Sequence, residues 1–271
     1  MSNEHLAFGI DISRYQYSPD GSVMMDFREA ALHRDPFITF VASRAGISWG
    51  YQDPWFMRNW TETRMMDEYR KEAGLKAFPV GRLAYHVLYP SQSPISQADN
   101  LFRIVGDAAN WDHDIIVMDN ELDQGQTKRT ITDCIKAFAE ICLQRTGMYP
   151  INYSRTGWMN AYTYTMELAF LDNWLAQYRY SLPYPMYTPE YPAPPDPLPQ
   201  GHDEWLIIQS AMRGKSIGSK AMHYMDYNRW NGDEKDVAKY CNFADIVQPP
   251  QHDLAWLIEI HENTELHPPL T

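Results

Sequence analysis

The chain has few cysteines and no long apolar run. Its 271 residues include three cysteines, Cys134, Cys142 and Cys241, and an odd number of thiols does not make a disulfide framework. No stretch approaches the roughly 18 apolar residues that cross a membrane. The polar start, Met1 to Phe8, lacks the apolar core of a signal peptide. We therefore expect free thiols, no membrane partner and no signal peptide.

Positive charge is also scarce. The 23 Lys and Arg residues are outnumbered by 35 Asp and Glu residues, which gives a formal net charge of −12. Nucleic-acid binding rests on a basic face, and docking to anionic membranes needs clustered cations. The charge balance therefore argues against both partners. A groove for a neutral glycan has no such requirement, so a carbohydrate partner stays open.

Common cofactor motifs are missing as well. The sequence has no phosphate-binding glycine loop and no Gly-x-Ser-x-Gly elbow. Its nine histidines form no His-x-x-x-His pair, and the run Asp112-His113-Asp114 is more typical of a solvated loop than of a metal site. We expect no cofactor and no metal. Aromatic residues are plentiful instead, at 14%, and such residues fill cores or stack on sugar rings.

Short apolar segments alternate with longer amphipathic ones in the first 153 residues. Strands are predicted over Phe8–Ser13, Phe37–Ser43, Val80–Val87, Ile115–Glu121 and Tyr149–Tyr153. Helices are predicted over Met24–His33, Pro54–Ala73, Ser93–Ala109 and Thr127–Thr146. A strand, helix, strand order favours parallel strands joined by crossover helices.

The second half of the chain has fewer helix signals. One short helix is predicted over Trp158–Met166, and strands over Asn173–Tyr178, Trp205–Gln209 and Met222–Tyr227. Residues 183–200 contain eight prolines, which predicts an extended, irregular loop. About eight strands with an incomplete set of helices predict an α/β fold: a single irregular TIM-like β/α barrel over residues 1–245. A tail or edge segment is expected over 246–271.

The most informative segment runs from Ile115 to Glu121. Four apolar residues lead into Asp119, Asn120 and Glu121. Side chains alternate along a strand, so the two acids are predicted to share a face about 6–7 Å apart. In a barrel, active sites lie at the C-terminal ends of the strands, and like charges so close raise one pKa, as a general acid requires. Alternatively, one acid points to solvent and the other caps the following turn.

Two more acids lie at the ends of predicted strands. Asp11 ends the first strand and Asp226 the last. Each alone can be explained as a residue of a strand-to-loop turn. Three strands that all end in acid instead favour carboxylates converging at the mouth of a barrel. Such a cluster fits glycoside hydrolysis or a divalent metal site.

These segments resemble the glycoside hydrolase family 25 muramidases, the Chalaropsis-type lysozymes, a family that includes phage endolysins. The resemblance covers roughly residues 6–232 in order and rests on Gly9–Gln16, Phe40–Gly46, Asp53–Phe56, Leu83–His86, Met118–Glu121, Tyr149–Tyr153, Trp174–Tyr178 and Asp226–Trp230. Two segments depart from the family pattern. Ala42–Ala45 stands where Lys-Ala-Thr-Glu is usual, and Ile208–Ser210 where Trp-Gln-Tyr is expected. These departures concern substrate preference more than reaction type.

The resemblance implies a peptidoglycan hydrolase that cleaves the β-1,4 bond between N-acetylmuramic acid and N-acetylglucosamine. It implies that Glu121 is the general acid and that Asp119 orients the 2-acetamido group of the substrate. Asp11 and Asp226 would complete the catalytic carboxylates. Substrate-binding roles are implied for Tyr85, Tyr153, Gln177, Tyr178 and Gln209. The expected partner is a peptidoglycan glycan strand, bound by a monomer. Attack by the acetamido group and direct attack by water both stay open.

Other functions remain as alternatives. A chitinase-like glycosidase usually has a longer Asp-rich run before its acid, whereas residues 115–118 are apolar here. A catalytically silent glycan-binding or virion structural protein would lack one of the paired carboxylates, and both are present. Without a signal peptide, the enzyme is expected to reach the cell wall through lysis, as a phage endolysin does, or by a non-classical export route.

Overall fold

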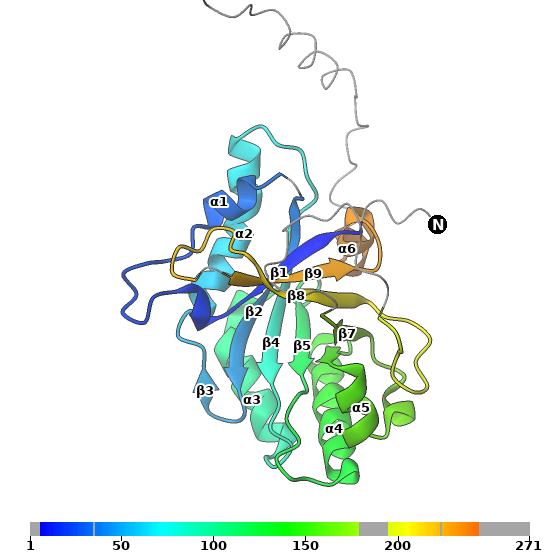
Figure 1. The fold of residues 1–271 in the computed structure, drawn as a ribbon. Coiled ribbons are helices and arrows are strands. Elements are labelled where there is room, and N and C mark those ends of the chain that lie inside the picture. Colours follow the sequence, from blue (N-terminus) through cyan, green and yellow to red (C-terminus); the bar gives the residue numbers. More distant parts are fainter. Residues whose placement is uncertain (1–5, 35, 179–194, 223, 244–271) are drawn as a thin grey trace, which may run out of the picture.

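The strands form a closed barrel. The computed structural model describes residues 6–34, 36–178, 195–222 and 224–243 (Figure 1). Eight strands pair in the order β1-β9-β8-β7-β6-β5-β4-β2, and β1 pairs with β2 to close the ring. Their bounds are β1 Phe8–Ile12, β2 Ile38–Ile47, β4 Gly81–Val87, β5 Ile115–Asp119, β6 Ile151–Ser154, β7 Asn173–Ala176, β8 Ile207–Lys215 and β9 Tyr224–Trp230. The predicted TIM-like α/β barrel is confirmed.

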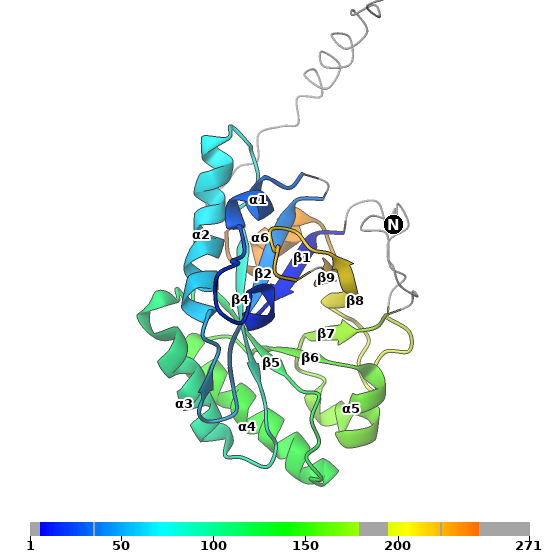
Figure 2. The ribbon, with the colours of Figure 1, turned by 60° about the vertical axis from the view of Figure 1, so that its left-hand side comes forward.

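The helices lie outside the ring of strands, as Figure 2 shows. Six α-helices are present among the described residues: α1 Phe27–Leu32, α2 Phe56–Glu72, α3 Pro94–Val105, α4 Lys128–Thr146, α5 Thr156–Tyr162 and α6 Glu234–Tyr240. Local signals set several ends. Ser93 caps α3 with Pro94 in its first turn, Thr127 caps α4, and Gly147 ends α4 with a φ of 80°. Among the described residues, no helix is long and apolar enough to span a membrane.

One strand runs against the others. The six pairings from β1–β2 round to β7–β8 are parallel, whereas β9 is antiparallel to both β8 and β1. The alternation of strands and helices predicted parallel strands, which holds for the first seven. Only residues 216–223 join β8 to β9, too few for the dozen or more that a parallel crossover needs. The last connection is therefore a hairpin.

Several elements differ from the sequence-based expectation. Strand β2 continues four residues past Ser43, and its end pairs with a two-residue strand, β3 Tyr51–Gln52. The helix expected over Trp158–Met166 is split into α5 and a 3-10 turn, Thr165–Leu168. Thr163 separates them, with its hydroxyl bonded to the carbonyl of Met159. Helix α6 was not predicted, and neither the segment 246–271 nor most of the loop 183–200 lies within the described residues.

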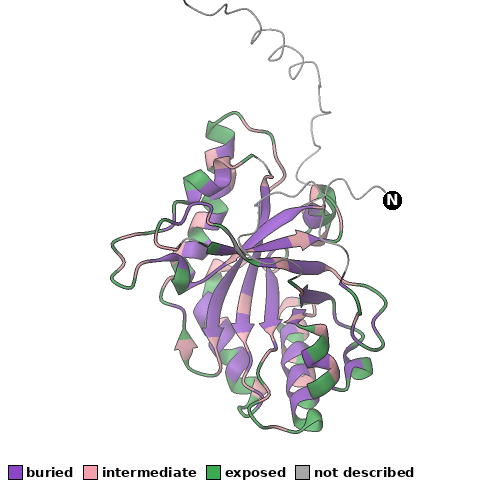
Figure 3. Ribbon diagram, viewed as in Figure 1, coloured by how far each residue is buried: buried purple, intermediate pink, exposed green. Residues whose placement is uncertain are grey.

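Apolar side chains fill the barrel below its C-terminal end. The strands are almost wholly buried, whereas the outer faces of the helices are exposed (Figure 3). Gly9 is needed here because a Cβ at this position would lie 2.4 Å from the ring of Phe40. Helix α6 closes the N-terminal end, where Val237 and Cys241 approach Gly81. All three cysteines are buried free thiols.

A buried histidine makes folding stability depend on pH. His86 on β4 stacks on Phe138 at 5.9 Å between ring centroids, and its Nε2 lies 2.8 Å from the carbonyl oxygen of Ser48. Burial lowers the pKa of His86 to about 4. An unfolded histidine titrates near 6.5, so protons favour the unfolded chain as the pH falls from about 6.5 towards about 4.

We predict that His86→Met removes this dependence. Between about pH 7.5 and about pH 5, the stability advantage of the wild type over the variant should shrink by on the order of 2 kcal/mol. Urea unfolding of both proteins at each pH measures it. Carboxyls with raised pKa values act in the opposite direction, but they do so in both proteins and cancel in the difference. A difference independent of pH would contradict the assignment.

Candidate active site

A cavity of about 480 Å³ opens at the barrel end where the parallel strands finish, called the mouth below. All four acids singled out in the sequence line it: Asp11, Asp119, Glu121 and Asp226. Other lining residues are Tyr15, Arg44, Tyr85, Tyr153, Trp174, Tyr178, Gln209, Met212, Met222 and Tyr224. The cavity is therefore an acidic pocket with aromatic and methionine walls.

The strand register brings Asp11 and Asp226 together. The two residues are direct partners in the β1–β9 pairing. Asp226 is the third residue of β9, not its end as the sequence analysis expected. Because β9 is antiparallel to its neighbours, its beginning lies at the same edge as the ends of the parallel strands. Asp226, near the start of β9, therefore lies at the mouth, beside the acids near the ends of the parallel strands.

The Asp119 and Glu121 pair also differs from its expected arrangement. Strand β5 ends at Asp119, so Glu121 lies two residues past the strand rather than on it. The intervening residue is held to β6, since the N–H of Asn120 donates to the carbonyl of Tyr153 and the hydroxyl of Ser154 donates to the carbonyl of Asn120. Both acids still line the cavity.

Neutral amides hold the Asp11 carboxylate. Gln209 Nε2 and Asn228 Nδ2 each donate to Asp11 Oδ2 at 2.9 Å. The Gln209 carbonyl oxygen in turn accepts from the hydroxyl of Tyr153 at 2.8 Å and from that of Tyr178. Trp174 Nε1 fixes Asn228 by donating to its Oδ1 at 3.1 Å. The amide N–H groups therefore have one orientation, towards Asp11.

Asp11 and Asp226 hold a proton between them. Burial, together with the charge of Asp11, the hydrogen bond to Asp11 and the charge of Glu121, raises the pKa of Asp226 to about 9. Burial also raises the pKa of Asp11, but hydrogen bonds from Asn228, Gln209 and Asp226 work against the rise. Two close carboxyls cannot both ionise freely. With a pKa of about 9, Asp226 is protonated at neutral pH and donates its hydrogen bond to Asp11.

Asp119 has an unsatisfied oxygen in the site. Its Oδ1 is buried and has no hydrogen-bond partner among the described residues. Burial raises its pKa well above the usual value, the charges of Glu121 and Asp11 add to this, and Arg44 opposes it. Arg44 is itself bound to the buried Asp53, with Nη2 and Nε both 2.9 Å from Oδ2. A buried polar atom without a partner is costly, so Asp119 is a candidate to bind a polar group of a ligand.

Glu121 is a partly buried carboxyl beside an arginine. Burial raises its pKa and so does the charge of Asp11, while the positive charge of Arg155 lowers it. Arg155 Nε lies 3.4 Å from Glu121 Oε2, and the Glu121 side chain is 33% exposed. A carboxyl with a raised pKa that faces a cavity is suited to donate a proton to a leaving group.

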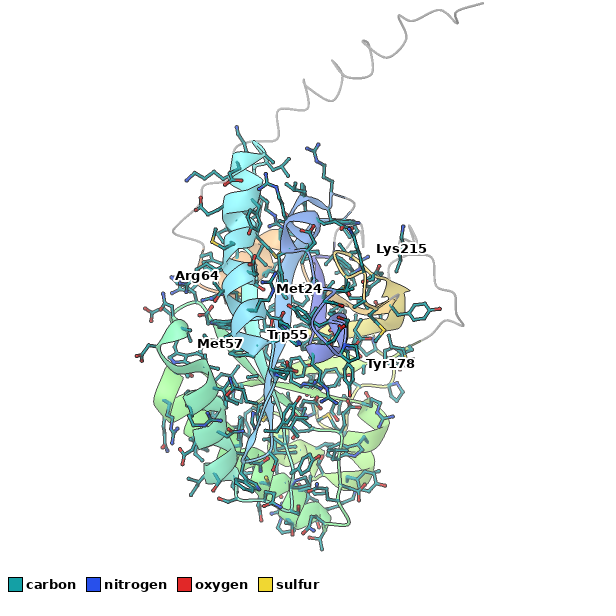
Figure 4. The ribbon with its side chains drawn as sticks, turned by 90° about the vertical axis from the view of Figure 1, so that its left-hand side faces the viewer. Met24, Trp55, Met57, Arg64, Tyr178 and Lys215 are labelled. Carbon is teal, nitrogen blue, oxygen red and sulfur yellow. The ribbon has the colours of Figure 1, made fainter. Side chains whose placement is uncertain are left out.

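The structure brings together eight of the nine residues named from the sequence. Gln177 is the exception. It lies after β7 and exchanges two hydrogen bonds with the backbone of Asp196, at 2.9 and 3.0 Å. Tyr178, the next residue, does line the cavity and is 41% exposed. Figure 4 shows it on the same side of the barrel as Lys215, the last residue of β8.

Some lining residues were not named from the sequence. Arg44 stood in one of the segments that depart from the family pattern, but only the structure shows that its guanidinium reaches the cavity. Met212, Met222 and Tyr224 come from the β8–β9 hairpin, whose register carries two irregularities. Within the described residues, no group of three or more His, Cys, Asp or Glu residues has the arrangement of a metal site.

A closed β/α barrel with paired carboxylates at its mouth has the architecture of a glycoside hydrolase. The sequence profile of glycosyl hydrolases family 25 matches residues 10–218. The chain belongs to this family and is a glycoside hydrolase of the muramidase class.

Solved structures show the same fold. A bacterial lysozyme from Streptomyces coelicolor superposes with a TM-score of 0.66 and 21% identity, over 88% of this chain and 98% of that one. A family 25 lysozyme from Aspergillus fumigatus gives 0.64 and 20%, over 87% and 98%. The catalytic domain of an endolysin from bacteriophage P40 of Listeria monocytogenes gives 0.55 and 13%, over 89% and 98%. No curated protein sequence matches the chain significantly.

We predict that Arg155→Gln raises the pKa of Glu121, because it removes the positive charge beside the carboxylate. The change should be small, since the Arg155 side chain is 54% exposed and solvent screens the pair. Carbon-13 NMR titration of labelled glutamate carboxyls measures it. Arg129→Gln is the matched control, because Arg129 pairs with Asp133 and Glu167 outside the cavity. Equal behaviour of the two variants would contradict a specific ion pair.

Proposed function

We propose that the protein hydrolyses the β-1,4 bond between N-acetylmuramic acid and N-acetylglucosamine in bacterial peptidoglycan, with Glu121 as the general acid. One observation carries the assignment. Glu121, a carboxyl with a raised pKa, shares a cavity with the buried and unpartnered Asp119 Oδ1. A proton donor and a polar acceptor are the two groups that hydrolysis of an N-acetylated sugar needs.

Glu121 donates the proton in the first step. As the glycosidic bond breaks, negative charge develops on the leaving oxygen, and a proton from Glu121 neutralises it. The carboxylate that results is then stabilised by Arg155 at 3.4 Å. It can take a proton from water when the second half of the reaction begins. One side chain thus acts first as acid and then as base.

Asp119 orients the substrate's 2-acetamido group. Its free Oδ1 can accept the acetamido N–H, which directs the acetamido carbonyl oxygen towards the anomeric carbon. In this substrate-assisted route the carbonyl oxygen attacks as the leaving oxygen departs, and water then opens the cyclic intermediate with retention. Direct attack by water would instead invert the anomeric carbon. The unpartnered oxygen favours the assisted route, because it supplies the acceptor that this route requires.

The Asp11–Asp226 pair supplies one negative charge beside the reacting sugar. Because one proton is shared, the pair can stabilise positive charge that develops at the anomeric carbon. Tyr85, Tyr153 and Tyr178 would bind or stack on sugar rings, and Gln209 orients the hydroxyls of the last two. The four acids therefore divide into a proton donor, a substrate acceptor and a shared-proton pair.

We infer that residues 1–245 are the catalytic unit and that it works as a monomer on the glycan strand. Release by lysis, in the manner of a phage endolysin, and a non-classical export route are both compatible with this activity. Gln177 keeps its proposed substrate role only if the substrate reaches beyond the cavity, because its amide is bonded to Asp196.

The proposal predicts that Glu121→Gln lowers the rate of wall clearing by about 10²–10⁴-fold, the usual contribution of general acid catalysis. Turbidity loss of purified bacterial walls measures the rate, and analysis of the new reducing ends identifies the bond. Glu68→Gln is the control, because Glu68 is an exposed residue of α2 paired only with Lys71 at 3.7 Å among the described contacts.

The products separate this function from its alternatives. N-acetylmuramic acid at the new reducing end supports a muramidase. N-acetylglucosamine there, or cleavage of chitin instead of walls, would indicate a chitinase-like glycosidase or a different wall bond. If the wild type clears no walls from several species, a silent glycan-binding role becomes the better explanation.

Asp119→Asn tests the assisted route. The asparagine can still touch the acetamido group but offers an amide whose oxygen is a weaker acceptor. We expect the rate to fall by roughly 10- to 100-fold, with retention of configuration in the wild-type product by proton NMR. An inverted product would show direct attack by water.

A further inference from the structure

A row of buried amides begins after Asp119 at the end of β5 and continues over the outer face of β6 and β7. Asn120 Nδ2 donates to Asn152 Oδ1 at 2.8 Å, and Asn152 Nδ2 donates to Asn173 Oδ1 at 3.0 Å. Asn173 Nδ2 lies 2.7 Å from His202 Nδ1. These four residues, called the amide ladder below, are all buried. The ladder crosses from the end of β5 over β6 and β7 to the segment after residue 200.

The ladder has one direction. His202 Nε2 lies 3.2 Å from the carbonyl oxygen of Thr165, an obligatory acceptor, so Nε2 carries the proton. Nδ1 of a neutral His202 is then an acceptor, which requires Asn173 to present its NH₂ group. The orientation of Asn173 fixes that of Asn152, which fixes that of Asn120. All three amides therefore donate in the direction of His202. No member can be reversed without leaving a buried donor facing a donor.

The near end of the ladder holds the residue between the two acids. Asn120 separates Asp119 from Glu121, and its backbone is already bound to β6 through Tyr153 and Ser154. The side-chain bond to Asn152 adds a third connection on the face opposite the cavity. Glu121 lies past the end of β5. Its position therefore depends more on how the Asn120 backbone is held than on the hydrogen bonds between β5 and its neighbouring strands.

We propose that the amide ladder is a positioning device: Asn152 and Asn173 hold Asn120, and through it set how Asp119 and Glu121 face the substrate. This inference rests on the function proposed above. None of the ladder residues lines the cavity, so they act through Asn120 and do not touch the substrate. Neutral amides suit this task because they fix the backbone without adding a charge that would alter the protonation of the acids.

Asn152→Leu tests the proposal. Leucine has a similar shape but cannot bond to Asn120 or Asn173, so the near end of the ladder is released. We expect kcat on a soluble glycan strand to fall by roughly 10- to 100-fold, with KM changed by less than about twofold, because the cavity walls stay in place. The variant also leaves two buried groups unpaired and lowers stability, so a control for stability is needed.

Leu168→Ala provides that control. Leu168 is fully buried in the apolar layer that also contains Met159, a neighbour of Asn152. Its truncation leaves a cavity and lowers stability without removing a hydrogen bond of the ladder. We expect Leu168→Ala to keep kcat near the wild-type value at a temperature where both variants are folded. Equal losses of kcat in the two variants, or none in Asn152→Leu, would overturn the proposal.

Asn173→Asp is the conservative variant. One oxygen of the new carboxylate still accepts from Asn152, while the other faces His202 Nδ1 and requires it to be protonated. Activity should therefore be close to wild type at mildly acidic pH and fall more steeply than wild type as the pH rises. Asp203, the charged neighbour of His202, remains in both proteins. A pH profile that matches the wild type throughout would contradict the direction of the ladder.

A measurement without substrate separates this proposal from the proposed function. Carbon-13 NMR titration should give a pKa for Glu121 that differs from wild type in Asn152→Leu and matches it in Leu168→Ala. If the wild-type protein cleaves no wall glycan, the proposed function fails, but the titration still decides whether the ladder positions the acid. Identical titrations in all three proteins would overturn the ladder.

Discussion

Four carboxyl groups share one cavity, and their mutual repulsion constrains the rest of the site. Neutral hydrogen-bond donors stabilise these carboxyl groups more than cations do. Asp11 receives two amide N–H groups at 2.9 Å and shares a proton with Asp226. Of the two nearby cations, Arg44 is bound to Asp53, and Arg155 is half exposed. Because little positive charge offsets the acids, burial and mutual repulsion raise their pKa values. Raised carboxyl pKa values suit the acid catalysis proposed above.

The shared proton depends on an irregularity of the barrel. Had the last strand been parallel, its first residues would lie at the closed end beside α6, and Asp226 would be far from Asp11. The short connection at residues 216–223 forces a hairpin instead. The antiparallel strand then places its beginning opposite the end of β1, in direct register. The antiparallel direction of β9 therefore accounts for the contact between Asp11 and Asp226.

The sequence was sufficient for the features that rest on local patterns. Apolar runs placed the strands, and acids at their ends placed Asp11 and Asp119 at the mouth. Features that depend on contacts between distant segments were not predictable. These are the direction of β9 and the position of Glu121 beyond the end of β5. The amide ladder shows why, because Asn120, Asn152 and Asn173 lie 32 and 21 residues apart. Only the register of adjacent strands reveals that they touch. Helix α6 did carry a local signal, the capping box of Asp233 and Asp236, which the sequence analysis missed.

Polar groups occupy both faces of β6 and β7 near the mouth, whereas the interior below them is apolar. On the inner face, Tyr153 and Trp174 orient amides towards Asp11; on the outer face, Asn152 and Asn173 bind Asn120. Buried polar groups rigidify a structure only when every member is satisfied. Asp119, whose Oδ1 has no partner, is the register partner of Tyr153 and the chain neighbour of Asn120, so it adjoins both networks. The two networks hold the residues beside Asp119 and leave its Oδ1 available for the acceptor role proposed above.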